Sequence, residues 1–507
     1  MKKTLVALCA LVAMTSALFA DEITNAELLR QMQALQRQMQ QMQEGYDKKI
    51  NELNDKISEL EGRKAATAQT PSSQANPPVQ PKAEVEQAPG PAAPLPSSDF
   101  TSEDLYARLN SRLGNLAPQL NQQGIQLGIS AVIDGNFHHD TAKEGLGEMK
   151  EEIAGFGHHH HDEEEGHHHH HGDKNGFNLH HIELGLSAEV DPYFRAWATL
   201  AFDDEEESTE IEEAVIQTTG LPYGLTLSAG KYMSGIGRIN RQHSHVWDFM
   251  DTPLVYEKFF GSHGLREKGV QLTWKAPTPF YLLFGAEAGN GENEAFSNQI
   301  GGEHLPDHDA PRLYTAFVKF APDLGDRHAL QLGLSYVNAR NQSLHEHEHD
   351  EGLEILALDG RNELYGADFV YKYAGLGEKG EGDFILQGEY FLRNSDMRDR
   401  EEHHTYTNRQ DGYYLQGIYG FAPRWRAGLR WEQIGLTNHI EDAEEGSWNA
   451  GSSYRATAMV DWKLSEFSLL RFQCGRHNYA TEEGREHAWE FGIQLQVSLG
   501  SHPAHDF

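Results

Sequence analysis

The last stretch of the chain, residues 488–499, alternates strictly between two kinds of position. Trp489, Phe491, Ile493 and Leu495 belong to an apolar series, and the residues between them are polar or glycine. A period of two predicts a β-strand with one apolar and one polar face. Twelve residues are long for a strand of a soluble sheet, whereas a strand that crosses a bilayer needs roughly 9 to 11 residues. We therefore expect the apolar face to contact lipid and the polar face to line a lumen.

The same alternation recurs upstream and predicts sixteen strands from residue 124 onward. The predicted strands are 124–134, 177–190, 193–202, 210–218, 224–232, 268–276, 279–288, 311–320, 328–338, 362–373, 383–393, 411–421, 424–434, 453–464, 466–477 and 487–499. Even-numbered strands are followed by short turns. Odd-numbered strands are followed by longer loops, at 135–176, 203–209, 233–267, 289–310, 339–361, 394–410, 435–452 and 478–486. This segregation is typical of a bacterial outer-membrane barrel with periplasmic turns and external loops. Sixteen strands predict an aqueous channel inside the barrel.

The segment before the barrel has a different periodicity. Apolar residues from Leu28 to Leu60 follow steps of three and four, the heptad spacing of a coiled coil. A basic start and an apolar core at 1–20 predict a secretory signal peptide. The expected fold class is thus an all-β transmembrane barrel of about 16 antiparallel strands, preceded by an α-helical coiled coil. The expected division is a signal peptide at 1–20, a periplasmic coiled coil at 21–62, a Pro-rich linker at 63–98, a short helix at 99–118 and the barrel at 124–507.

Composition narrows the class of protein further. Hydrophobic residues make up 38% of the 507 residues, and no apolar run after the N-terminus reaches the roughly 18 residues of a transmembrane helix. Lys and Arg number 42 against 77 Asp and Glu, so the net charge is −35. This charge argues against binding nucleic acid and favours small cations as partners.

The loop predicted at 233–267 contains motifs that resemble a known family. These motifs are Gly235-Ile236-Gly237-Arg238-Ile239-Asn240-Arg241, Asp251-Thr252-Pro253, Phe260-Gly261, Gly264 and Gly269-Val270. With the layout of the chain, they resemble the phosphate-selective porin superfamily, particularly its trimeric members with an N-terminal periplasmic coiled coil. The resemblance implies passive, substrate-selective diffusion through a homotrimeric channel whose third loop folds inward as the constriction. It does not extend to phosphate specificity, because the loops are acidic and the predicted lumen has no lysine ladder.

Charged residues predicted at the lumen suggest where solutes would be selected. The expected constriction residues are Arg238, Arg241, His243, His245, Asp248, Asp251 and Glu257. The expected pore-wall residues are Arg195, Arg424, Arg426, Arg430, Arg455 and Arg471. The arginines could form a basic wall that selects ions, or a salt-bridged wall that only supports the acidic third loop. The pattern alone leaves both interpretations open.

Histidine is concentrated in the predicted outer loops. The chain has 29 His, and the candidate metal ligands are His158, His159, His160, His161, Asp162, Glu163, His167, His168, His169, His170, His171, Asp173, His345, His347 and His349. Imidazole is a strong ligand for zinc, copper and nickel, and nearby carboxylates add oxygen ligands. A solvated low-complexity loop with incidental metal affinity is the simpler alternative. We expect several exchanging sites for zinc or another divalent transition metal, with no cofactor required.

The expected function is that of an outer-membrane porin, a passive diffusion channel for small hydrophilic solutes or ions, whose outer loops bind or concentrate zinc. A general or anion-selective porin with incidental histidines is the alternative. An energised zinc receptor fits less well, because that architecture needs a plug domain and about 22 strands. A structural envelope protein also remains open. No catalytic constellation is recognised, so the chain is not expected to be an enzyme.

Overall fold

The structure is a computed structural model that describes residues 126–156, 174–203, 208–261, 263–297, 299–302, 304–349, 352–400, 404–443, 446–481 and 484–500. The chain divides into two compact units, 1–98 and 99–507, and every described residue belongs to the second. The predicted signal peptide, coiled coil, linker and short helix lie outside the described residues. The histidine-rich tract 158–171 and Asp173 lie outside them as well.

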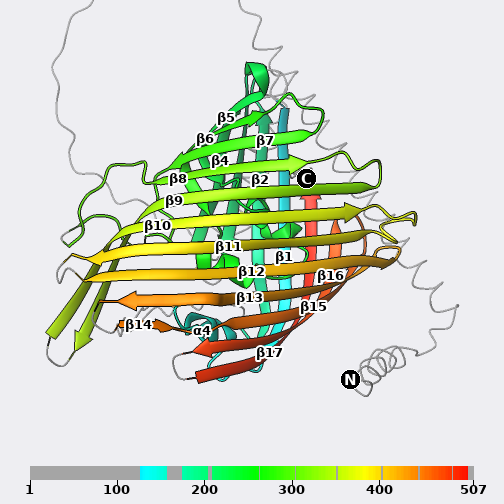
Figure 1. Cartoon of the computed structure of the whole chain (residues 1–507). Helices are drawn as coiled ribbons and strands as arrows, with labels where there is room; N and C mark the ends of the chain where they lie inside the picture. Colours follow the sequence, from blue (N-terminus) through cyan, green and yellow to red (C-terminus); the bar gives the residue numbers. More distant parts are fainter. Residues whose placement is uncertain are drawn as a thin grey trace, which may run out of the picture. The chain divides into compact units, whose positions relative to one another are not determined.

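The described residues form a closed antiparallel barrel of sixteen long strands (Figure 1). Each long strand pairs with the next one along the chain, and the last pairs with the first. The strands are β1 (Gln126–Asp140), β2 (Gly176–Glu189), β3 (Phe194–Asp203), β4 (Ser208–Thr218), β5 (Leu225–Met233), β6 (Arg266–Lys275), β7 (Tyr281–Gly289), β8 (Leu313–Ala321), β9 (His328–His349), β10 (Gly352–Tyr373), β11 (Phe384–Asp399), β12 (Thr405–Ala422), β13 (Trp425–Asp442), β15 (Ser453–Lys463), β16 (Ser468–Thr481) and β17 (Gly484–Gly500). A short additional strand, β14 (Gly446–Asn449), pairs with the end of β13.

The sixteen predicted strands match these sixteen long strands, so the antiparallel barrel is confirmed. The differences lie at the long-loop end, where several strands continue past their predicted ends. The clearest case is the predicted loop 339–361, because β9 and β10 run 22 residues each and pair with one another across it. Apolar residues alternate only in the part of a strand that faces lipid. Strand pairing that continues beyond that part therefore leaves no such pattern in the sequence.

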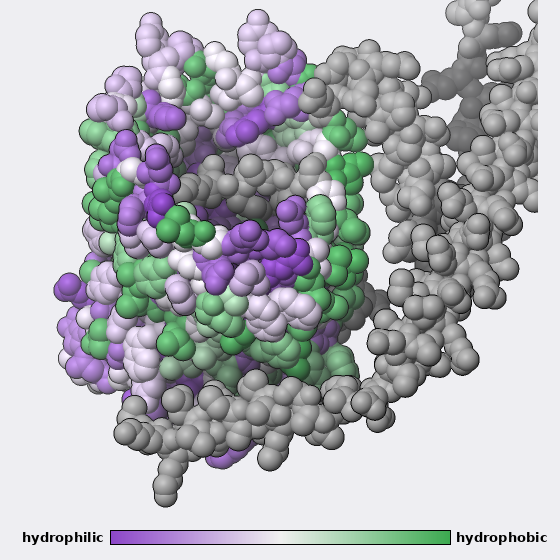
Figure 2. Space-filling model, turned by 90° about the vertical axis from the view of Figure 1, so that its right-hand side faces the viewer, coloured by the Kyte–Doolittle hydropathy of each residue, from purple (hydrophilic) through white to green (hydrophobic). Residues whose placement is uncertain are grey.

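The barrel is apolar outside and polar inside. On β17, Phe491 and Leu495 are 46% and 50% exposed, whereas Gln494 and Gln496 between and beside them are 2% and 8% exposed. This alternation agrees with the predicted faces and reverses the arrangement of a soluble globular domain. One end of the molecule has hydrophilic residues around a central hollow and hydrophobic residues along one side (Figure 2). Among the described residues, no helix is long and apolar enough to span a membrane.

The interior is not uniformly water-lined, which corrects the expectation of a simple aqueous channel. An apolar core inside the barrel contains Leu146 and Met149 of α4 (Leu146–Glu151) together with most of α5 (Leu254–Phe260). Strand residues such as Val337 and Phe391 pack against them. Neither helix was predicted, because each is a single short segment inside a loop and has too few residues to show a helical period. Two loops therefore bring their own hydrophobic residues into the barrel and bury them there.

Candidate functional site

The loop between β5 and β6, residues 234–265, folds into the barrel and is called the third loop below. It contains the 3-10 turns η2 (Ile239–Arg241) and η3 (Ser244–Val246) and the helix α5. Pro253 precedes the helix, where its missing N–H costs nothing, and Gly261 follows it at φ 81°, a left-handed conformation that favours glycine. Apart from Glu257, every residue of α5 is buried. The inward third loop implied by the porin resemblance is therefore seen in this chain.

Two wall glutamates hold the beginning of the third loop by its backbone. Glu287 of β7 accepts hydrogen bonds from the Ser234 hydroxyl, at 2.5 Å, and from the Gly235 N–H, at 2.8 Å. Glu389 of β11 accepts from the N–H groups of Arg238 and Ile239, at 2.7 and 3.0 Å. Such charge-assisted bonds satisfy backbone groups that the barrel interior removes from water.

Gly237 shows why this turn needs glycine. Its φ is 54°, and a Cβ at this position would lie 2.2 Å from the Tyr256 hydroxyl and 2.3 Å from a Glu389 oxygen. Tyr256 itself donates a hydrogen bond to Glu389 at 2.7 Å. A side chain at 237 would thus separate the loop from the carboxylate that holds it.

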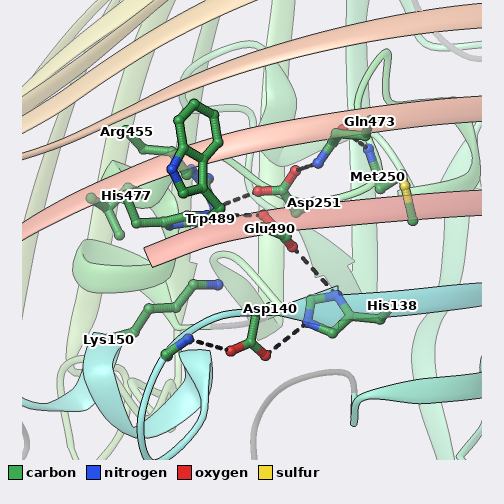
Figure 3. A network of polar contacts seen from close by, with 12 residues as sticks. His138, Asp140, Lys150, Met250, Asp251, Arg455, Gln473, His477, Trp489 and Glu490 are labelled. Carbon is green, nitrogen blue, oxygen red and sulfur yellow. Dashed lines mark hydrogen bonds and ion pairs between the residues drawn. The ribbon is translucent and has the colours of Figure 1, made fainter. Parts of the chain in front are cut away.

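The middle of the third loop is held by arginines of strands β13 and β15. Asp251 pairs with Arg430 of β13 at 2.9 Å and with Arg455 of β15, and Gln473 donates a hydrogen bond to its other oxygen at 2.7 Å. Figure 3 shows Asp251 lying between Arg455 and Gln473. Burial alone would raise the pKa of Asp251, but the charges of Arg430 and Arg455 hold it well below its usual range. Asp251 is therefore ionised throughout the neutral range.

A second set of ion pairs lies beside the first. Asp248 of the third loop pairs with Arg426 at 2.9 Å, and Arg426 also pairs with Asp461 of the wall. Arg471 donates to Asp461 at 2.8 Å and to the Trp247 carbonyl of the loop at 3.0 Å. Both sets thus connect the loop to strands β13, β15 and β16.

The charges in this wall are balanced. Four guanidinium groups meet four carboxylates, and the members are Arg426, Arg430, Arg455 and Arg471 with Asp248, Asp251, Glu432 and Asp461. Of the two interpretations left open by the sequence, this arrangement is the salt-bridged wall that supports the loop. A cluster without net charge offers little field to select anions.

Two predicted wall residues lie elsewhere. Arg424 is in the turn before β13, at φ 69°, and donates a hydrogen bond to the Leu464 carbonyl at 2.9 Å. Arg195 of β3 is exposed and donates to Gln217 of β4 at 2.7 Å. Alternation assigned both residues to the lumen face. It does not show whether a residue lies in a strand or in a turn, or on which side of the barrel it lies.

Glu257 faces the first loop. It pairs at 2.7 Å with Lys150 of α4, which places the first loop and the third loop in direct contact. Arg238 and Arg241 are half-buried in and beside η2. The predicted constriction residues thus belong to one inward loop, although most of their charged groups are engaged by the wall or by α4.

His243 and His245 were predicted as constriction residues. The structure places both in the third loop, where they are buried against the wall. His243 Nδ1 lies 2.9 Å from Glu212 and its Nε2 lies 3.1 Å from Glu213, both on β4. Burial opposes protonation, but the hydrogen bonds to Glu212 and Glu213 raise the pKa of His243 to about 10. The sequence pattern gave no role to Glu212 or Glu213.

The predicted metal ligands are described in part or not at all. His345, His347 and His349 belong to the end of β9, where the predicted loop is a strand. All the other predicted ligands, in the tract of the first loop, lie outside the described residues. Zinc binding by these histidines therefore stays a prediction.

Comparison with known proteins gives one relative and several remote structures. No family model matches the sequence. An uncharacterized protein of Aquifex aeolicus (strain VF5) is 34% identical over 422 residues, which span 80% of this chain and 85% of that protein. The chain belongs to the family of this Aquifex protein.

Among solved structures, the outer membrane channel DcaP of Acinetobacter baumannii is 14% identical, covers 75% of this chain and 98% of its own, and gives a TM-score of 0.47. The anion-selective porin from Comamonas acidovorans is 11% identical, covers 74% of this chain and all of its own, and gives a TM-score of 0.43. The sequence identity to both proteins is too low to transfer a solute or an oligomeric state to this chain.

Proposed function

We propose that this protein is an outer-membrane porin, a passive diffusion channel whose narrowest part is set by the third loop. The observation behind this proposal is a closed sixteen-strand barrel that is apolar outside and polar inside, with a loop folded into it. A closed barrel leaves no unpaired strand edge in lipid, so it is one of two kinds of backbone able to cross a bilayer.

The proposal places the protein in the bacterial outer membrane as a homotrimer, with its coiled coil in the periplasm. Support for this finer part is the heptad spacing between Leu28 and Leu60 and the segregation of loop lengths. The resemblance of the third-loop motifs to phosphate-selective porins points the same way. The balanced wall around Asp251 does not favour anions, so we propose small hydrophilic solutes without a preference for phosphate.

Zinc or a similar divalent cation is the second part of the proposal. The tract at 158–171 combines nine histidines with four acidic residues, and the chain as a whole carries a net charge of −35. Carboxylates concentrate cations and imidazoles retain transition metals. Metal held at the outer mouth would reduce the negative charge that permeating ions meet.

Purified protein in planar bilayers tests both parts. The matched variant replaces the nine histidines of 158–161 and 167–171 by Asn, which keeps length and polarity. Under a salt gradient we expect ohmic channels, a reversal potential that micromolar zinc shifts toward anion preference in the wild type, and no such shift in the variant. If the purified protein forms no channels, the proposal that it is a porin is wrong. Channels whose reversal potential zinc leaves unchanged would favour a general porin with incidental histidines.

A further inference from the structure

A buried cluster of histidine and glutamate joins the third loop to the barrel wall, away from the arginines described above. His243 and His245 come from the loop, Glu183 from β2, and Glu212 and Glu213 from β4. His245 Nδ1 lies 3.0 Å from Glu183, and His243 Nδ1 lies 2.9 Å from Glu212 and 3.6 Å from Glu183. Four of these side chains, all but Glu213, are less than 9% exposed. Buried imidazoles and carboxylates from three segments thus converge on one point.

The distances are those of a metal site before the ion is placed. Glu183, Glu212 and His243 each offer one ligand atom, and these atoms lie within 4.8 Å of one another. Two ligands that bind one zinc ion tetrahedrally are about 3.4 Å apart, since each bond is about 2.1 Å long. The separations of His243 Nδ1 from Glu212 and Glu183, at 2.9 and 3.6 Å, and of His245 Nδ1 from Glu183, at 3.0 Å, lie near that spacing.

A β-bulge explains how two consecutive residues reach the same histidine. In a regular strand, Glu212 and Glu213 would point to opposite faces. The register between β3 and β4 shifts so that Thr199 pairs with Glu213 and Leu200 pairs with Ile211, which leaves Glu212 as the extra residue. Bulges turn a side chain out of the alternation and are frequent beside functional sites.

Glu213 is placed to orient the imidazole of His243 by a hydrogen bond, without binding the ion itself. In this role it is called the outer ligand below. It accepts a hydrogen bond from His243 Nε2 at 3.1 Å, while His243 Nδ1 faces the other carboxylates. Glu213 is itself oriented by the Trp197 indole N–H, at 3.3 Å. A carboxylate that receives the far N–H of a metal-binding imidazole fixes the tautomer and the orientation of the ring.

The negative charge of the carboxylates in the cluster also favours the binding of a cation. Three carboxylates are close together, and Arg266 pairs with one of them, Glu212, at 2.9 Å. Buried carboxylates are costly without a compensating charge, and a divalent ion bound between them supplies one. The competing arrangement is a metal-free cluster in which His243 is an imidazolium that donates to Glu212 and Glu213.

We propose that this cluster binds one divalent transition-metal ion of the zinc type through His243, His245, Glu183 and Glu212, with Glu213 as the outer ligand. The ion fastens the third loop to β2 and β4, strands that the arginine wall does not include. The mixed nitrogen and oxygen donors suit zinc and neighbouring first-row metals more than magnesium or calcium. The site depends neither on the outer histidine tract nor on whether the barrel conducts.

The test uses the full chain in detergent, with the outer histidines removed so that they do not contribute zinc. In this background, His158–His161, His167–His171, His345, His347 and His349 are all replaced by Asn. The protein is stripped with a chelator, reloaded with zinc chloride, desalted and analysed for metal per chain. We expect one retained zinc per chain in the background, none after His243→Asn or Glu212→Gln, and a 10–100-fold weaker affinity after Glu213→Gln.

His477→Asn is the matched control. It removes another buried histidine that contacts a glutamate, Glu490 at 3.0 Å, and should retain the zinc. Heat-modifiable migration of each variant shows whether the barrel has folded. If His243→Asn does not fold, zinc-edge X-ray absorption of the background protein decides, with a shell of two imidazoles and two carboxylates expected. A folded background that retains no zinc, or a shell of a different kind, overturns the proposal.

Discussion

At the residue scale, the side chain of Lys258 is buried, and burial disfavours its charged form. It lies on α5, inside the barrel, and is 9% exposed. Its removal from water lowers its pKa to about 8. Because the unfolded chain holds the proton up to a pH of about 10.4, charged Lys258 costs stability below pH 8, and the cost disappears as pH rises from 8 to 10.4.

We therefore predict that Lys258→Met stabilises the barrel at pH 7 by about 3 kcal/mol and removes this part of the rise in stability above pH 8. The measurement is the midpoint of thermal unfolding in detergent at pH 7, 8, 9 and 10. Lys268→Met, at an exposed lysine of β6, is the control and should change the midpoint little. An equal effect of both substitutions would show that burial of Lys258 is not the cause.

At the element scale, the third loop is positioned by ion pairs, and Asp251 contributes most to them. Its depressed pKa means that the stabilisation is present above the unfolded value of about 3.9 and is lost as pH falls below it. Replacing a partner of a buried ion pair leaves charge uncompensated, which costs roughly 3–5 kcal/mol. Here Glu432 still faces both arginines, so the lower end of that range applies.

Asp251→Asn should accordingly loosen the loop by about 3 kcal/mol without unfolding the strands. Single-channel recordings at neutral pH should show more current noise and a changed conductance, whereas wild-type channels should keep their behaviour down to a pH well below 4, because Asp251 stays ionised in the folded protein. Asp309→Asn, at an exposed outer-loop aspartate, is the matched control. Unchanged noise and conductance in Asp251→Asn would mean that the loop does not border the conducting path.

The elements also show what the sequence could and could not predict. Most of the sixteen long strands follow from alternation, because lipid and lumen impose opposite polarities on neighbouring residues. The bulge at Glu212 is invisible to that pattern, since it breaks the period at one residue, and so the carboxylates around His243 were missed. The arginines from Arg426 to Arg471 were recognised as inward residues, but their pairing with Asp248 and Asp251 depends on how the third loop folds.

At the scale of the whole molecule, the barrel is apolar outside and polar inside. The effect of a charged residue introduced on its surface therefore depends on where that residue lies. Leu495 is half exposed on the apolar face of β17, and Leu376 is 78% exposed in the turn between β10 and β11. The proposal places Leu495 in lipid and Leu376 in water. The same substitution should therefore have different effects at the two positions.

We predict that Leu495→Lys destabilises the barrel by about 2–4 kcal/mol in lipid bilayers, whereas Leu376→Lys has little effect. Denaturant-induced unfolding in vesicles measures both, with tryptophan fluorescence as the signal. Similar small effects at the two positions would mean that the outer face of β17 is not covered by lipid, and the membrane assignment would be wrong.

The pair β9 and β10 continues beyond its neighbours. Residues 344–349 pair with 352–357, whereas the pairing of β8 with β9 ends at Ala339 and that of β10 with β11 begins at Leu358. These six residue pairs extend the ribbon by on the order of 20 Å. In the proposed orientation the long loops lie outside the cell, where antibodies and bacteriophages would meet this ribbon. Its sequence and length can therefore diverge under their pressure while the strands that cross the membrane stay as they are.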